Sequence, residues 1–468
     1  MKLLVVMASF GTSQDRYLEP VVKNYRQMKY EVDVVIVSNV AKAVPEGVEL
    51  VVGMPTKDPW SLPFAHKKVM AERANDYDLF IYSECDTMVF EKNIDAFLRV
   101  SEALPETEIP GFLLYENSPL GVRRYAGAHT RFHWDPASVC TRGAYTFAYF
   151  TNEHAACYLI TQKQLQQAIA SGNFLVAPYR GTYDLACTAS TDPYTRCGYR
   201  KLICISHLED FVIHHTPDKY TPASFTEHEQ EFEKQIKALL AMGRNGTKGE
   251  SLLPTETRLW EAKHSKEYYE EVREEVVREI PESVRSVLSL GSGTGKAEEW
   301  LVNKGMRVTA VPLDPVIGVC MEGTGIEIVN GDLRGVREKL AGRKFDCLYL
   351  SNVLHLMENP AGMLKEFVEL LNPGGCVMVV TPNVAMLRNK IYRAIGKPGF
   401  ENVGNYELGG AHNVSRKILE KWFRGAGCHE ERVKWVVAPK FSGLTRIFPR
   451  LLNGMFASEI IALAKKAR

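Results

Sequence analysis

A glycine-rich turn follows a run of apolar residues in the second half of the chain. Residues 287–290 read Val-Leu-Ser-Leu, and the next five are Gly291, Ser292, Gly293, Thr294 and Gly295. Glycine lets the backbone approach a ligand closely, because it has no Cβ. A dinucleotide fingerprint would need glycine where Lys296 stands, and a phosphate-binding P-loop would need glycine where Leu290 stands. The turn therefore predicts a small-molecule site that is neither a dinucleotide site nor a P-loop.

Two acidic residues follow an apolar run in the first half of the chain. Residues 79–82 read Leu-Phe-Ile-Tyr, and Glu84 and Asp86 come shortly after them. Alternation along an extended chain places these two carboxylates on one side. Such a pair suits Mg²⁺ or Mn²⁺, which favour oxygen ligands. A cation held there would bind a diphosphate and stabilise it as it leaves.

Both halves alternate apolar runs with helical patterns, which predicts an α/β fold. The predicted strands are residues 3–7, 34–37, 79–82 and 111–114 in the first half, and 286–290, 308–311, 326–329, 346–350 and 377–380 in the second. Helical patterns at 18–28, 63–74 and 93–103 separate the strands of the first half. Continuous apolar strands separated by helices indicate parallel sheets covered on both faces. Ligands of such sheets bind at the carboxyl ends of the strands, where the glycine turn and the acidic pair both stand.

Length and composition indicate a soluble protein of two domains. The chain has 468 residues, and residues 243–250 form a polar, glycine-rich stretch between charged helical runs at 227–242 and 257–279. We expect one domain over 1–245, a linker over 246–256 and a second domain over 257–468.

The charge balance, the apolar runs and the cysteines exclude several classes of protein. The 57 basic and 56 acidic residues give a net charge of +1, without the basic excess of a nucleic-acid-binding protein. The longest apolar runs, such as 376–380, are too short to span a bilayer. The ten cysteines contain no Cys-x-x-Cys pair, so free thiols in a reducing cytoplasm are expected.

The second half resembles class I S-adenosylmethionine-dependent methyltransferases. The Gly-x-Gly-x-Gly spacing of the turn is similar to motif I of that family, residues 345–355 to its fourth strand, and residues 370–375 to its Pro-Gly-Gly hairpin. Residues 329–333 are similar to the end of its third strand, where an acidic residue contacts adenine. The resemblance implies a Rossmann-like, seven-stranded domain that binds S-adenosylmethionine. The implied cofactor-binding residues are Gly291, Ser292, Gly293, Gly295, Asp332, Leu333 and Asn352.

Two features of this half bear on ribose binding and on the acceptor. The family has an acidic residue at the tip of strand two, which binds the ribose hydroxyls; Pro312 holds that place here. Asp314, two residues on, either substitutes for it or caps the next turn. A hydroxyl acceptor also needs a base, for which His355 and His412 are the candidates. The alternative for each histidine is a structural role beside the cofactor.

The first half resembles GT-A glycosyltransferases, with Glu84 and Asp86 in place of the Asp-x-Asp motif. Such enzymes take a nucleotide-sugar donor and often complete the Mn²⁺ or Mg²⁺ site with a late histidine, which His214 and His215 could supply. Residues 150–161 and 183–192 are similar to acceptor-side segments of the superfamily. An inverting enzyme would need a carboxylate base, with Asp184 and Asp192 as candidates; a retaining enzyme would need neither. The aromatic residues within 114–150 are either a sugar-binding surface or core packing.

Together the two halves predict a bifunctional enzyme. It would transfer a sugar to a glycan or lipid-linked glycan and methylate a glycan hydroxyl, in the biosynthesis of a surface polysaccharide. The alternative is an active methyltransferase joined to a glycan-binding module without catalysis. A further possibility is peripheral membrane contact by residues 441–456, which include Arg446, Phe448, Arg450, Leu451 and Leu452; the other interpretation places this segment among the last strands of the sheet.

Overall fold

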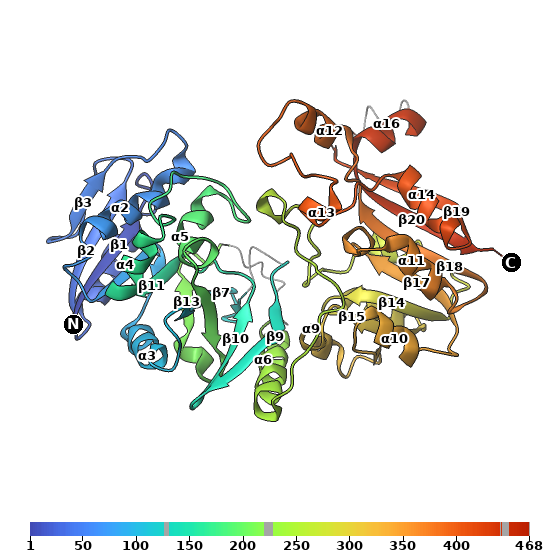
Figure 1. Cartoon of the computed structure of the whole chain (residues 1–468), viewed down its shortest axis with the longest axis horizontal. Coiled ribbons are helices and arrows are strands. Elements are labelled where there is room, and N and C mark those ends of the chain that lie inside the picture. Colours follow the sequence, from blue (N-terminus) through green and yellow to red (C-terminus); the bar gives the residue numbers. More distant parts are fainter. Residues whose placement is uncertain (126–130, 220–227, 440, 442–448, 468) are drawn as a thin grey trace. The chain divides into compact units, whose positions relative to one another are not determined.

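The computed structural model describes residues 1–125, 131–219, 228–439, 441 and 449–467, arranged as two compact units (Figure 1). Unit 1 is Met1–Lys248 and unit 2 is Gly249–Arg468. The division falls within the predicted linker, 246–256. The second part of that stretch belongs to unit 2, because Leu252 is buried and its backbone N–H donates to the carbonyl of Leu313 at 2.7 Å.

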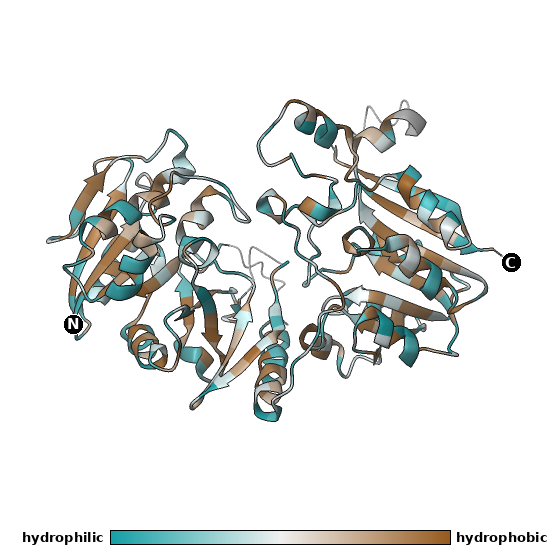
Figure 2. Ribbon diagram, viewed as in Figure 1, coloured by the Kyte–Doolittle hydropathy of each residue, from teal (hydrophilic) through white to brown (hydrophobic). Residues whose placement is uncertain are grey.

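Unit 1 is built around a five-stranded sheet in the order β11-β4-β1-β2-β3. Its strands are β1 (Lys2–Ala8), β2 (Glu31–Ser38), β3 (Glu49–Val52), β4 (Leu79–Glu84) and β11 (Cys157–Thr161). All are parallel except β11, which runs antiparallel to β4. The associated helices are α1 (Asp15–Arg26), α2 (Ala65–Glu72), α3 (Glu91–Ser101), α4 (Gln162–Ala170) and α5 (Leu185–Thr195). The apolar residues gather in the strands (Figure 2), as the sequence predicts for a sheet covered on both faces.

Two four-stranded sheets complete unit 1. One has the order β6-β12-β10-β9 and the other β5-β13-β7-β8. Their strands are β5 (Thr87–Met88), β6 (Glu108–Pro110), β7 (Leu113–Asn117), β8 (Arg123–Arg124), β9 (Trp134–Arg142), β10 (Tyr145–Phe150), β12 (Arg200–Cys204) and β13 (Val212–His215), and helix α6 (His228–Asn245) packs against β9. Strand β5 follows the acidic pair directly and pairs with β13, with Thr87 opposite His215. This pairing brings two segments distant in sequence to one place.

Unit 2 contains a seven-stranded sheet in the order β16-β15-β14-β17-β18-β20-β19. Strand β20 pairs antiparallel with both β18 and β19, and the other neighbouring strands pair in parallel. The strands are β14 (Ser286–Ser292), β15 (Arg307–Pro312), β16 (Glu327–Ile328), β17 (Phe345–Ser351), β18 (Leu371–Pro382), β19 (Cys428–Val437) and β20 (Ala457–Lys466). The helices are α7 (Glu274–Val277), α8 (Lys296–Asn303), α9 (Pro315–Gly318), α10 (Leu333–Lys339), α11 (Pro360–Val368), α12 (Leu387–Ala394), α13 (Tyr406–Gly409), α14 (Arg416–Gly425) and α16 (Pro449–Phe456). All five strands predicted for this half are present.

The predicted helical run 257–279 is wrong for most of its length. Only a short 3₁₀ turn at Trp260–Ala262 and α7 are helical there. Glu261, Ala262 and His264 have φ values of 54°, 46° and 68°, in the left-handed region that a right-handed helix cannot include. The charged composition of this stretch suits a helix, but tertiary contacts with the sheet of unit 2 decide its path.

Membrane-spanning helices are absent from the described part of the chain: no helix there is both long and apolar enough to cross a bilayer. Residues 442–448, which carry Arg446 and Phe448 of the predicted membrane contact, lie outside the described residues.

Candidate functional site

The glycine turn lies between the carboxyl end of β14 and the start of α8. Gly291 and Gly295 have φ values of +78° and +89°, which favour glycine over any residue with a side chain. A Cβ on Gly293 would lie 2.0 Å from the carbonyl oxygen of Tyr268, and that oxygen accepts a hydrogen bond from the Thr294 N–H at 3.1 Å. The irregular segment before α7 therefore packs directly on the turn.

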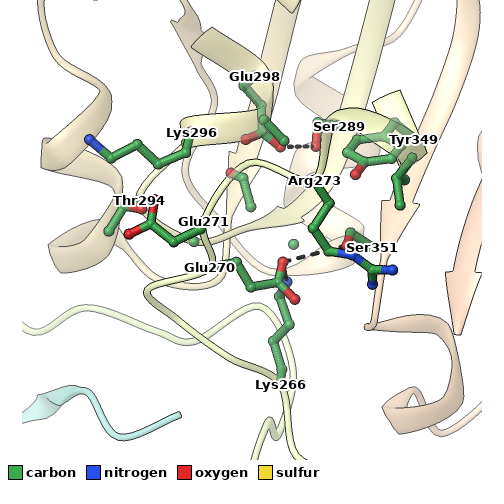
Figure 3. A pocket seen from close by; sticks show the side chains of 16 residues that line it. Lys266, Glu270, Glu271, Arg273, Ser289, Thr294, Lys296, Glu298, Tyr349 and Ser351 are labelled. Carbon is green, nitrogen blue, oxygen red and sulfur yellow. Dashed lines mark hydrogen bonds and ion pairs between the residues drawn. The ribbon is translucent and has the colours of Figure 1, made fainter. Parts of the chain in front are cut away.

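A small pocket of about 30 Å³ adjoins this turn and is lined by charged side chains (Figure 3). Lys266 forms an ion pair with Glu270. Glu270 also accepts hydrogen bonds from the Ser351 hydroxyl at 3.4 Å and the Asn352 amide at 3.3 Å. These contacts join the segment before α7 to the carboxyl end of β17. The pocket thus combines groups from three parts of unit 2.

Asn352 stands just after β17 in a strained conformation. Its φ is 53°, in the left-handed region that few residues other than glycine adopt. Its N–H donates to the carbonyl of Val380 at 2.8 Å, and its side-chain amide reaches Glu270. Strain of this kind concentrates at functional sites. The predicted residue Asn352 is therefore beside the pocket, with its side chain turned toward a pocket residue.

Glu298 is a buried carboxyl group on the wall of the same pocket. It belongs to the first turn of α8 and accepts a hydrogen bond from the Ser289 hydroxyl at 2.6 Å. Burial is the main influence on this carboxyl group and raises its pKa. The pocket therefore offers cations, Lys266 and Arg273, next to carboxylates, Glu270 and Glu298.

Sequence reasoning missed the charged residues of this pocket. Lys266, Glu270 and Arg273 lie in the stretch predicted as a surface helix, where charged residues are ordinary. Among the charged residues of the pocket, Glu298 could have been found from the sequence. It stands three residues after the turn, at a position that faces the sheet once α8 forms. Long-range packing of the irregular segment brings the others to the turn.

Two predicted acidic cofactor residues act as helix caps. The Asp314 carboxylate is buried and accepts from the N–H groups of Val316 and Ile317 at 2.7 and 2.8 Å. Asp314 therefore caps α9 through Oδ1. Burial, and to a smaller extent the charge of Asp314, raises the pKa of the Tyr268 phenol. Asp332 is exposed and caps α10, accepting from the Gly335 N–H at 2.8 Å.

The two candidate bases of unit 2 are bound to backbone carbonyls. His355 is buried, with Nε2 2.7 Å from the carbonyl oxygen of His264, so Nε2 carries the proton and donates. Burial lowers the pKa of His355 to about 3. His412 donates from Nε2 to the carbonyl of Met357 at 2.9 Å and stacks on Tyr406. Both arrangements match the structural alternative, in which the histidines hold turns together.

In unit 1 the acidic pair lies beside one of the two predicted histidines. Asp86 is buried, and its Oδ2 is 3.5 Å from Nε2 of His215, whose Nδ1 is 2.5 Å from Oε1 of Glu116. Burial lowers the pKa of His215, but hydrogen bonds to Asp86 and Glu116 outweigh burial and raise it to about 9. Burial and the neighbouring Asp86 raise the pKa of Glu84 to about 7.

The other predicted histidine, His214, does not join this cluster. Its Nε2 is 3.0 Å from Oδ1 of Asp218, and its ring stacks on Tyr115 with centroids 5.0 Å apart. Adjacent residues of β13 point to opposite faces, so only one of the two can face the acidic pair. Over the described residues, no group of three or more histidine, cysteine, aspartate or glutamate side chains is arranged to hold a metal ion.

The two candidate bases of unit 1 have different surroundings. Asp192 is fully buried in α5, forms an ion pair with Lys67 and accepts from the Tyr179 hydroxyl. It is a structural carboxylate, and its prediction as a base is wrong because no acceptor can reach it. Asp184 caps α5 through the Cys187 N–H at 2.9 Å, and its charge contributes to the raised pKa of Glu84. Asp184 stands two residues before Ala186, which lines one pocket together with Glu84 and Asp86.

A second pocket, of about 380 Å³, opens beside the acidic pair. Glu84 and Asp86 line it together with Phe10, Trp60 and Lys219. Phe10 and Trp60 are about half exposed, which leaves aromatic faces for a flat ligand. Of the two interpretations of the aromatic residues within 114–150, core packing describes Phe132, Trp134, Phe147 and Phe150, which are buried.

Comparison with known proteins assigns part of the chain. Residues 262–430 match a family model described as a methyltransferase domain. Residues 262–430 form a methyltransferase domain. Two Ubiquinone biosynthesis O-methyltransferases of Xylella fastidiosa are similar to it: that of strain 9a5c is 29% identical over 34% of this chain, and that of strain M23 is 30% identical over 31%. The matches span 66% and 62% of those relatives.

Solved structures of methyltransferases also align with this chain. A SAM-dependent methyltransferase from Archaeoglobus fulgidus covers 41% of the chain and 91% of its own, at 17% identity and a TM-score of 0.32. The alignment with an S-adenosylmethionine-dependent methyltransferase from Mesorhizobium loti covers 41% of this chain and 96% of that protein, at 18% identity and a TM-score of 0.31. The glycine turn, the charged pocket and the two histidines of unit 2 all fall within the matched segment 262–430.

Proposed function

We propose that unit 2 transfers a methyl group from S-adenosylmethionine to a hydroxyl of a small or lipid-linked acceptor. The observation that carries this proposal is the glycine turn at the end of β14, inside the segment that matches the methyltransferase family. The similar Xylella fastidiosa proteins are O-methyltransferases by name, which supports oxygen as the methyl acceptor. S-adenosylmethionine supplies a methyl group on a sulfonium, and the protein's task is to align it with the acceptor.

The charged pocket suits the amino-acid end of this cofactor. That end carries a carboxylate and an ammonium group, and the pocket presents Lys266 and Arg273 as well as Glu270. Gly291, Ser292, Gly293 and Gly295 would hold the cofactor through their backbone, with Asn352 beside them. Asp332 and Leu333 stand at the start of α10 and would contact the adenine. Pro312 offers no acid for the ribose hydroxyls, and Asp314, two residues on, caps α9 through Oδ1.

The two candidate histidines of unit 2 would position neighbouring segments and would not act as general bases. A histidine whose pKa is lowered to about 3 is a poor proton acceptor at neutral pH, so His355 would serve as scaffold. Its bond to the His264 carbonyl fixes the segment that carries Lys266 and Glu270. His412 holds the neighbouring turn through Met357.

Calorimetric titration of the full chain with S-adenosylmethionine tests the proposal. Glu270→Gln keeps the shape of the side chain and removes its charge, so we expect binding at least tenfold weaker, the loss of about one charge-assisted hydrogen bond. Glu366→Gln, on the exposed side of α11, is the matched control and should bind like the wild type. Wild-type protein that binds no S-adenosylmethionine, or equal binding by all three proteins, would refute this site.

For unit 1, the second candidate function is metal-dependent transfer of a sugar from a nucleotide-sugar donor to a glycan, as in surface polysaccharide synthesis. One observation favours it: the 3.5 Å separation of Asp86 Oδ2 and His215 Nε2, with Glu116 orienting the ring from Nδ1. Asp86 and His215 are the two residues that would hold Mn²⁺, leaving other positions for diphosphate oxygens. Asp184, near Glu84, would be the base of an inverting reaction.

Nucleotide release from a panel of nucleotide sugars with Mn²⁺ tests this second function. Release from one donor that is lost in Asp86→Asn would support it. If no donor is bound or cleaved, unit 1 is better explained as a glycan-binding module, and the methyl transfer of unit 2 remains independently testable.

A further inference from the structure

A short helix of unit 2 exposes large apolar side chains. Helix α12 follows β18, and Ile391 and Ile395 are 47% and 68% exposed. Residues four apart lie on one side of a helix, so these two form a continuous apolar stripe. Apolar and hydrophilic residues lie side by side along this helix (Figure 2). A stripe of this kind on a protein surface marks a contact site.

Basic residues surround this stripe. Arg388, Lys390, Arg393 and Lys397 are all exposed. No acidic residue occurs between Glu369 and Glu401, so nothing in the local sequence neutralises these charges. Clusters of lysine and arginine next to exposed apolar residues are attracted to anionic lipid surfaces.

The opposite face of α12 is firmly held. Asn389 is buried and donates to the carbonyl of Val384 at 2.9 Å. Tyr392 packs edge-on against the buried Phe400, with ring centroids 4.9 Å apart. Arg393 donates to the carbonyl of Val403 at 3.1 Å. The helix therefore cannot turn to bury Ile391 and Ile395, and they stay at the surface.

We propose that α12 docks unit 2 onto a bilayer that carries anionic phospholipids. The isoleucines would enter the interfacial region, and the basic side chains would contact the headgroup phosphates. A symmetric contact with a second copy is disfavoured, because it would bring two strongly positive surfaces together. Strands β14, β17 and β18 are parallel, so α12 leaves the same sheet edge as the glycine turn. Docking would place that edge near the lipid.

Co-sedimentation of the full chain with vesicles tests this inference. The vesicles contain either phosphatidylcholine alone or phosphatidylcholine mixed with phosphatidylglycerol. We expect wild-type protein to sediment with the anionic vesicles and not with the neutral ones. Arg388→Glu/Lys390→Glu should reduce this binding at least tenfold, at about 1 kcal/mol for each basic residue near an anionic surface. Ile391→Ser/Ile395→Ser should weaken it as well.

Lys417→Glu/Lys421→Glu changes the same charge on the exposed face of α14 and is the matched control, expected to bind like the wild type. S-adenosylmethionine titration and the melting temperature report folding of every variant, so failure of the cofactor site is distinguished from failure of docking. The inference is overturned if wild-type protein binds no vesicles or both kinds equally. It is also overturned if the α12 variants bind like the control, or if Ile391→Ser/Ile395→Ser changes the oligomeric state in the absence of lipid.

Discussion

The Glu298 carboxyl group illustrates how burial sets the properties of a single residue. Its pKa is raised in the folded protein, so the native state holds the proton more tightly than the unfolded chain does. Its contribution to stability is therefore present at pH values below the unfolded pKa and is lost as the pH rises through the folded pKa. A glutamine at position 298 can still accept the hydrogen bond from Ser289 but does not ionise, so the protein would not lose this stability as the pH rises.

We predict that Glu298→Gln raises the melting temperature of unit 2 near neutral pH and has a smaller effect at acidic pH. Thermal denaturation followed by circular dichroism across this range measures it. Glu299→Gln, on the next residue and half-buried, provides the comparison. An equal shift at both pH values would mean that the charge of Glu298 has no part in it.

Asp192 and Lys67 form a buried ion pair, whose two charges compensate each other. Removing one partner of a buried ion pair leaves the other charge without compensation. We predict that Asp192→Ala lowers the free energy of unfolding of unit 1 by about 3–5 kcal/mol, because Lys67 is also buried. Lys67→Met/Asp192→Leu should recover much of this loss. Urea denaturation measures both variants, and a double variant no better than the single one would contradict the explanation.

At the scale of elements, the sequence predicted those strands correctly in which every residue is buried. Residues 3–7 of β1 and 286–290 of β14 are apolar or small and fully enclosed, so their pattern has one interpretation. The run 257–279 failed because its charged residues suit a helix, whereas three left-handed residues fix its path across the sheet. These conformations depend on partners more than a hundred residues away, such as Gly399, which the local sequence cannot indicate.

Gly399 is one of those partners. A Cβ there would lie 1.7 Å from Cε3 of Trp260, and Gly399 has a φ of +82°. We predict that Gly399→Ala displaces Trp260, speeds hydrogen exchange in residues 257–268 and weakens S-adenosylmethionine binding. Gly396→Ala is the matched control: its φ is +63°, with open space around its Cβ, so it adds backbone strain without the clash. Equal effects of the two substitutions would assign the change to backbone strain alone.

At the scale of the whole molecule, the sequence indicated where the candidate site residues stand in the fold better than it indicated what surrounds them. The glycine turn, Asn352 and the Asp86–His215 pair all stand at strand ends, where the rule for parallel sheets places them. The surroundings of Asp192 and His214 depend on which way a side chain faces after packing, and the structure places both away from the acidic pair's histidine, His215. Lys266 and Glu270 escaped prediction, since their segment reaches the turn only through tertiary contacts.

Two units on one chain also mean that each site can be tested in the presence of the other. The family match lies within unit 2, so the central claim concerns that unit. The acidic pocket of unit 1 provides an internal reference, because it should not respond to S-adenosylmethionine.

Hydrogen–deuterium exchange of the full chain, with and without S-adenosylmethionine, tests this claim most directly. We predict slower exchange in residues 266–273 and 291–298, which line the charged pocket, and no change around Glu84 and Asp86 in unit 1. No protection anywhere, or protection confined to unit 1, would contradict the assignment of the cofactor site.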